Sequence, residues 1–148
     1  MNLNIEDVAT NEQIIQLARN NLEQGPWDYL VGGAESETTM RRNRLAFDKL
    51  AFRPRVLINT SSIDSSSEFL GYKIRMPILL APIGSQQNFT KDGASVATKA
   101  AHKFNVIDVI SSVSEPNLET IAQAADNPKV FQLYLHGDWE WTEEMVAR

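Results

Sequence analysis

The chain has 148 residues, of which 43% are hydrophobic and 22% charged, a composition typical of a folded domain with a core. Its net charge of −5 argues against a nucleic-acid partner, and its apolar runs are far shorter than the ~20 residues of a transmembrane helix. The absence of cysteine excludes disulfides and thiolate chemistry. Together with an N-terminus that shows no secretory signal, it predicts a cytoplasmic location.

Two helices are predicted within the first 31 residues. Thr10 and Gln13 have the spacing of a capping box, and the apolar residues after them predict a helix that runs to about Gln24. Pro26 predicts a short second helix that starts at this residue and ends at Val31, because proline is favoured at the first helical position.

A third helix is expected to start at a cap formed by Ser36 or Thr38. Its buried side is predicted to contain Met40, Leu45, Phe47 and Leu50. A polar connection follows, and residues 69–74 have the pattern of a small β-hairpin. We therefore expect a helical N-terminal part at 1–66, a hairpin at 67–76 and a third part at 77–148.

Three short apolar runs in the third part are typical of buried parallel strands. Helical patterns separate these runs, so the order strand, helix, strand, helix, strand predicts an α/β fold. Polar or turn-forming residues follow each run, at the strand ends where parallel sheets bind their ligands. The runs are Ile78–Ala81, Val106–Ile110 and Val130–Phe131, and the third strand is expected to span Lys129–Leu135.

Side chains that follow these runs are the candidates for binding. Gln132 and Tyr134 alternate with apolar neighbours and so share one face of a strand, where a buried glutamine needs a ligand or other polar partners. Gly84 and Ser111 suit a binding site, but equally a turn and the start of a loop. Tyr29 on the second helix is either a tyrosine that only packs or a binding residue.

Six short motifs follow one another along the chain: Asp28-Tyr29 with Gly33-Ala34, Phe52-Arg53-Pro54-Arg55, Met76-Pro77-Ile78, Ala81-Pro82-Ile83-Gly84, Ser111-Ser112, and Phe131-Gln132-Leu133-Tyr134. In this order and spacing they resemble the FMN-dependent α-hydroxy acid oxidases and dehydrogenases, the family of glycolate oxidase, lactate oxidase, flavocytochrome lactate dehydrogenase and mandelate dehydrogenase. The resemblance covers essentially the whole chain, but only the N-terminal half of a typical member. It implies the N-terminal part of a TIM barrel, with about three barrel strands at 77–148 as the first units of an FMN-binding barrel.

The resemblance also implies roles for individual residues. The backbone of Pro82, Ile83 and Gly84 is expected to lie against the flavin ring. Ser111 and Gln132 are expected to form hydrogen bonds with its polar edge, since a glutamine amide both donates and accepts. Tyr134 is expected to contact both cofactor and substrate, and Tyr29 the substrate, because a neutral phenol donates to a carboxylate or hydroxyl oxygen without adding charge.

The implied reaction removes two electrons from the α-carbon of a small 2-hydroxy acid, giving a 2-oxo acid and reduced FMN. In the family, the histidine base, the arginines and the lysine lie on later strands, so no catalytic residue and no metal ligand is assigned here. His102 and His136 do not match the position of the base. The chain is therefore expected to be inactive alone. The electron acceptor and the oligomeric state stay open, and the full-length form could be a homo-oligomer.

Two alternatives are retained. The first is a non-catalytic segment that folds by associating with a complementary half through its open sheet edge. The second is another FMN barrel, such as a type 2 isopentenyl isomerase, although the motifs at 52–55 and 132–134 suit the hydroxy acid group better. Val113 replaces a bulky aromatic residue of several members, which predicts room for a larger substrate side chain than that of glycolate.

Overall fold

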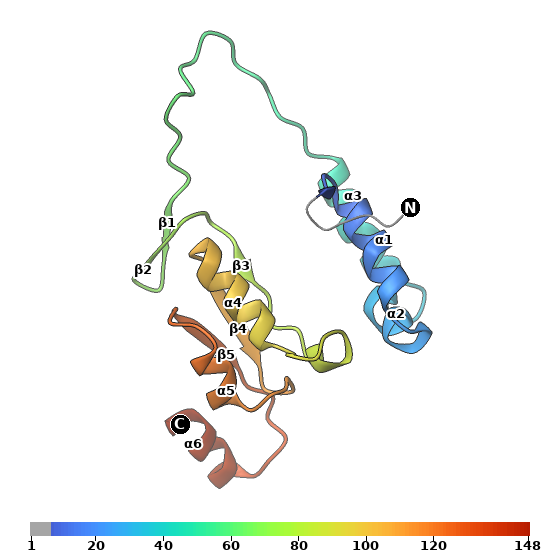
Figure 1. Cartoon of the computed structure of the whole chain (residues 1–148), viewed down its shortest axis with the longest axis vertical. Helices are drawn as coiled ribbons and strands as arrows, with labels where there is room; N and C mark the ends of the chain where they lie inside the picture. Colours follow the sequence, from blue (N-terminus) through green and yellow to red (C-terminus); the bar gives the residue numbers. More distant parts are fainter. Residues whose placement is uncertain (1–6) are drawn as a thin grey trace. The chain divides into compact units, whose positions relative to one another are not determined.

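The computed structural model describes residues 7–148, which form two compact units that divide between Ser62 and Ile63 (Figure 1). Residues 7–62 contain three α-helices, whereas the second unit contains a hairpin, a parallel sheet and further helices. Within the described part of the chain, no helix is long and apolar enough to cross a membrane.

The first unit consists of α1 (Asn11–Asn21), α2 (Gln24–Val31) and α3 (Thr38–Asp48). The predicted capping box at the start of α1 is confirmed. The Gln13 N–H donates to the Thr10 hydroxyl at 3.3 Å, and the Gln13 side-chain oxygen accepts from the Thr10 N–H at 3.1 Å. This reciprocal pair satisfies backbone groups at the beginning of the helix that have no partner within it.

The starts of α2 and α3 differ from the sequence expectation. α2 begins at Gln24, so Pro26 lies inside the first turn, where helical N–H groups have no partner and proline is also tolerated. Glu37 is the N-cap of α3, with a φ of 56° and no side-chain cap bond. The prediction of a Ser36 or Thr38 cap is wrong, because these two hydroxyls bond to each other at 2.9 Å.

The predicted burial of one side of α3 is also wrong. The four apolar residues of the predicted buried side are 41% to 76% exposed, and Leu50 lies beyond the end of the helix; they are Met40, Leu45, Phe47 and Leu50. None of residues 7–62 is buried. The apolar pattern of α3 therefore predicts a helix correctly, but within the described residues it does not bury the side chains of that helix.

The second unit begins with an antiparallel hairpin of β1 (Ser67–Phe69) and β2 (Tyr72–Ile74). Leu70 and Gly71 form its turn with positive φ values of 51° and 80°, the backbone that two-residue hairpin turns favour. Ile74 is buried, and the next residue along the chain donates its N–H to the backbone oxygen of Asn105 at 2.9 Å. The hairpin is therefore attached to the helix end that precedes the central strand of the sheet.

A three-stranded parallel sheet in the order β3-β4-β5 forms the centre of the second unit (Figure 1). The predicted α/β fold is thereby confirmed. The strands are β3 (Leu79–Leu80), β4 (Ile107–Ser111) and β5 (Lys129–Gln132). β5 ends before the expected Leu135, because its last ladder partner is Ser111 at the end of β4.

Helices α4 (Ser95–Phe104) and α5 (Leu118–Gln123) follow β3 and β4 and pack on one face of the sheet. The short helix η2 (Gln86–Asn88) precedes α4, and α6 (Trp139–Ala147) follows β5. The core between the sheet and the helices consists of Ala94, Ile110 and Ile121, with Leu118 and Phe131 packed against it.

A buried polar pair lies in this same layer between helix and sheet. Asp108 on β4 is 3% exposed and Thr98 on α4 is fully buried, and the threonine hydroxyl donates to the carboxylate at 2.6 Å. Burial raises the pKa of Asp108, while the Thr98 hydroxyl and Lys129 act to lower it. Lys129 lies opposite Asp108 in the ladder, and its ammonium donates to two backbone oxygens, of Ala125 at 2.6 Å and Asn127 at 2.9 Å.

Candidate functional site

The predicted binding residues of the second unit meet where the three parallel strands end. We call residues 81–85, 111–114 and 132–134 the strand tips. Ser111 and Gln132 are the last paired residues of β4 and β5. Ile110 and Phe131, one position earlier, contact the helical core, so the side chains of Ser111 and Gln132 point to the opposite face of the sheet.

Gly84 lies directly against the tip of β4. A methyl group at its Cα would be 2.7 Å from Cγ2 of Val113 and 3.7 Å from the Ser111 hydroxyl. The shorter distance is below any ordinary carbon contact, so only glycine fits beside Val113 as it stands. Residue 84 therefore has no side chain that could cover the backbone of residues 82–84.

The polar side chains of the tips differ in burial and in partners. Ser111 is 3% exposed, and its hydroxyl oxygen accepts from the Val113 N–H at 3.4 Å. Gln132 is half-buried, and among residues 7–148 its side-chain amide has no hydrogen-bond partner. A half-buried amide of this kind is suited to a polar ligand, because it presents both a donor and an acceptor.

Tyr134 is held by its backbone, with its side chain half exposed. Its N–H donates to the Ser112 hydroxyl at 3.1 Å, and 51% of the residue is exposed. Tyr29 belongs to the first unit, lies on α2 and is 65% exposed. The structure thus brings together Gly84, Ser111, Gln132 and Tyr134, and the proposed role of Tyr29 stays a prediction.

Four hydrogen bonds connect the tips to one another. The Ser85 N–H donates to the backbone oxygen of Val113 at 3.1 Å, and the Ser114 hydroxyl donates to that of Ile83 at 3.0 Å. On the other side, the Ser112 N–H donates to the backbone oxygen of Gln132 at 3.0 Å, next to the Tyr134 bond. The connecting roles of Ser112 and Ser114 were not predicted, since their partners are 22 and 31 residues away in the chain.

His136, which follows the tip of β5, contacts an aromatic side chain. Its ring centroid lies 4.7 Å from that of Trp141, with the rings tilted by 40°. Gly137 lies between them in the sequence, and a side chain there would clash with the Trp141 ring at 2.6 Å. These contacts attach the β5 loop to α6, which supports a packing role for His136.

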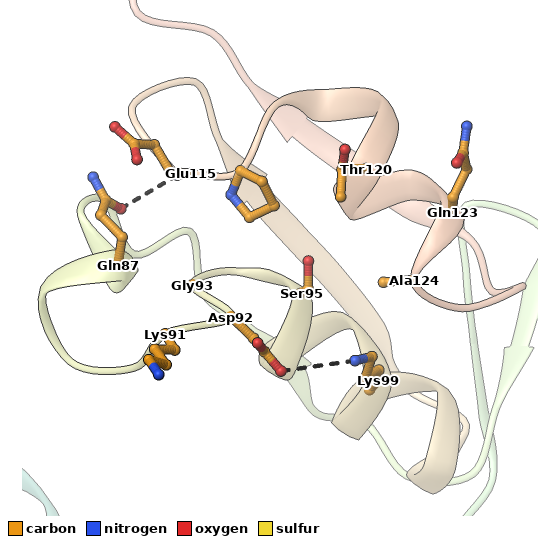
Figure 2. A pocket seen from close by; sticks show the side chains of 11 residues that line it. Gln87, Lys91, Asp92, Gly93, Ser95, Lys99, Glu115, Thr120, Gln123 and Ala124 are labelled. Atoms are coloured by element: carbon orange, nitrogen blue, oxygen red, sulfur yellow. Dashed lines mark hydrogen bonds and ion pairs between the residues drawn. The ribbon is translucent and has the colours of Figure 1, made fainter.

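A separate pocket of about 470 Å³ opens beside the starts of α4 and α5 (Figure 2). Figure 2 shows Lys99 directed toward Asp92, and these side chains form an ion pair at 4.0 Å. Buried Ser95 and the exposed Thr120 also line it. None of the four residues grouped at the strand tips lines this pocket. Its polar lining residues come from separate segments of the chain, so no sequence motif indicated the pocket.

Comparison with known proteins gives consistent results. The family profile described as FMN-dependent dehydrogenase matches residues 18–148. Glycolate oxidase 1 of Oryza sativa subsp. indica is 38% identical over 132 residues, covering 89% of this chain and 36% of that protein. A peroxisomal (S)-2-hydroxyacid oxidase of Arabidopsis thaliana is 33% identical over 144 residues, covering 97% of this chain and 40% of that protein.

Solved structures are similar over nearly the whole chain. A soluble mutant of the membrane-associated (S)-mandelate dehydrogenase from Pseudomonas putida matches with a TM-score of 0.85 at 32% identity, covering 92% of this chain and 39% of that one. A mandelate oxidase matches with a TM-score of 0.85 at 28% identity, covering 93% and 40%. The chain therefore spans little more than a third of the length of the relatives it matches.

Proposed function

Because this chain belongs to the FMN-dependent dehydrogenase family, we propose that it supplies part of the FMN and substrate site of an enzyme that oxidises a 2-hydroxy acid to a 2-oxo acid. The observation that carries the proposal is the grouping of Gly84, Ser111 and Gln132 at adjacent strand tips. The two named relatives are a glycolate oxidase and an (S)-2-hydroxyacid oxidase, which supports the substrate class.

The chemistry of the tips fits a flavin. One edge of the flavin ring carries carbonyl acceptors and an N–H donor, and the Gln132 amide offers the complementary donor and acceptor. Val113 fills the space that a side chain of Gly84 would need, so this glycine lets the β3 and β4 tips approach each other closely. We propose that Pro82, Ile83 and Gly84 lie along the ring, with Ser111 and Gln132 at its polar edge.

The tyrosines are proposed to bind the substrate. Tyr134 is half exposed beside Gln132, so its neutral hydroxyl is available to an oxygen of the 2-hydroxy acid as well as to the cofactor. Tyr29 would contribute a second phenol. Each phenol would donate its hydroxyl to a carboxylate or hydroxyl oxygen of the substrate.

Bound FMN would accept the two electrons that leave the α-carbon, and residues of this chain would only bind and orient the reactants. We assign no catalytic base to the chain, since His136 packs against Trp141. We therefore propose that these residues act within a larger barrel and that the chain is inactive alone. The cytoplasmic location stays a prediction, and one of the relatives is named as peroxisomal.

A chimera tests the proposed function. Residues 18–148 would replace the matching segment of rice glycolate oxidase 1, and the purified protein would be examined for bound flavin. We expect a yellow protein whose flavin absorption is bleached by a 2-hydroxy acid in the absence of oxygen. Gln132→Leu should weaken FMN binding at least severalfold, whereas Gln123→Leu, an exposed glutamine on α5, should leave it unchanged.

A folded chimera that contains no flavin would reject the proposal. That outcome would favour the alternative of a non-catalytic segment that folds by association. Flavin binding without bleaching by any 2-hydroxy acid would instead retain the cofactor and reject the substrate class.

A further inference from the structure

The strand ladders end before the segments that are proposed to contact FMN. β3 pairs with β4 at two positions, and the last is Leu80 opposite Asp108. The segment 82–84 therefore lies beyond the ladder and has no strand bonds of its own. On the other side, β5 pairs with β4 as far as Gln132, so Tyr134 also lies beyond the last ladder pair.

Two serine hydroxyls of the β4 tip hold these two segments. After β4 the chain makes a tight turn, which is closed by the Ser114 N–H donating to the backbone oxygen of Ser111 at 3.1 Å. From this turn the Ser114 hydroxyl reaches the backbone of Ile83 at 3.0 Å, and the Ser112 hydroxyl accepts from the backbone of Tyr134 at 3.1 Å. The two partner segments belong to different neighbours in the sheet.

We propose that Ser112 and Ser114, which we call the serine brace, are positioning residues that fix the spacing between the β3 and β5 tips and so preorganise the site for flavin. The flavin part of this inference rests on the proposed function. Neither side chain needs to touch the cofactor, because each acts through the backbone of a residue that is proposed to do so.

The neighbouring contacts make the brace specific to this turn. The Ser85 N–H donates to Val113 at 3.1 Å, so the β3 tip is bonded on both sides of Gly84. Val113 fills the space beside Gly84, which fixes how closely the two tips approach. A brace of this kind requires a side-chain acceptor at 112 and a side-chain donor at 114, and a hydroxyl serves both purposes.

Amide hydrogen exchange of the 148-residue chain tests the brace without any ligand. Ser112→Ala removes the acceptor of the Tyr134 N–H and should accelerate its exchange by about fivefold, as expected for one net hydrogen bond of ordinary strength. Ser114→Ala removes the donor to the Ile83 oxygen and should accelerate exchange of the nearby Ser85 N–H, which donates to Val113, because the β3 tip is then held on one side only. Each variant should leave the other tip unchanged. Ser112→Thr and Ser114→Thr keep the hydroxyl and should restore wild-type exchange.

Ser65→Ala is the matched control. The Ser65 hydroxyl also donates to a backbone oxygen, that of Arg75 at 3.1 Å, but in the hairpin region of the same unit. This variant should not change exchange at Tyr134 or Ser85. If the two brace variants leave both amides as protected as in the wild type, the brace is wrong.

FMN titration of the chimera that carries residues 18–148 tests the consequence for the cofactor. Each alanine variant should weaken FMN binding by about two- to tenfold and alter the visible spectrum of the bound flavin, and each threonine variant should restore both. Faster exchange with unchanged FMN affinity would overturn the preorganising role. If the wild-type chimera binds no FMN, the proposed function fails, and the exchange rates of the 148-residue chain still decide whether the brace exists.

Discussion

The two units of the chain are stabilised in different ways. The second unit has buried residues on β4, α4 and α5, whereas none of residues 7–62 is buried. Helices of the first unit depend on local features such as the capping box at Thr10, while the second unit depends on contacts between elements. An amphipathic pattern therefore specifies that a helix forms, but only the packing of several elements specifies what it buries.

Truncation of a core side chain should show the largest difference in stability between the two units. Ile121 is 1% exposed in the core of the second unit, so Ile121→Ala should lower the free energy of unfolding by about 2–5 kcal/mol through lost burial and a residual cavity. The comparison is Leu45→Ala on α3, where the side chain is 49% exposed and we expect a change within about 0.5 kcal/mol.

Urea unfolding followed by circular dichroism measures both variants. An equal loss for Leu45→Ala and Ile121→Ala would show that the first unit possesses a core of its own, and the contrast between the units would then be wrong.

The buried polar pair is the next most sensitive feature. Thr98→Val keeps the shape of the side chain but removes the hydroxyl that donates to Asp108, so it should cost about 1.5–3 kcal/mol at pH 7, as for a buried hydrogen bond to a charged group. Thr39→Val on exposed α3 is the matched control and should change the free energy of unfolding by less than about 0.5 kcal/mol.

The buried carboxyl group of Asp108 should make the stability of the second unit depend on pH. Burial raises the pKa of Asp108 above its ordinary value of 3.8, so the native state holds its proton to a higher pH than the unfolded state does. Wild-type stability from this group is therefore fully present below pH 3.8 and is lost as the pH rises through the raised pKa. Asp108→Asn should remove this dependence, which is measured as the free energy of unfolding against pH. If Asp108→Asn shows the same pH dependence as the wild type, the proposed effect of burial is wrong.

Local signals explain what the sequence predicted well. The capping box at Thr10 and the hairpin pattern at 69–74 involve neighbours in the chain, and both features are present. The parallel strands were recognisable from their continuous apolar runs. Only β4 is largely buried, whereas the residues of β3 and β5 are half-buried, which differs from the expectation of three buried strands. The exposure of the apolar side of α3 and the roles of Ser112 and Ser114 were not predictable, since both depend on which distant segments lie nearby.

Removal of helix caps should show the same contrast at a smaller scale. Thr10→Ala removes the α1 cap and Asn117→Ala removes the α5 cap, each costing about 1 kcal/mol. We expect Thr10→Ala to lower helicity without shifting the unfolding of the second unit, because α1 supports no core. Asn117→Ala should shift that transition, because α5 carries Ile121. Separate probes in the two units, such as amide exchange, distinguish these results.

The smallest effect is expected at the ion pair between α1 and α3. Glu12 and Arg44 approach to 3.8 Å, but their side chains are 66% and 72% exposed, so water and salt screen the attraction. A double-mutant cycle with Glu12→Gln and Arg44→Gln should give a coupling of at most about 0.5 kcal/mol, and none in 1 M salt. Arg44 also lies 3.9 Å from Asp48, and the cycle separates that contact from the one with Glu12. A coupling above about 1 kcal/mol that resists salt would mean that the α1–α3 contact is shielded from water, and the first unit would then resemble the second.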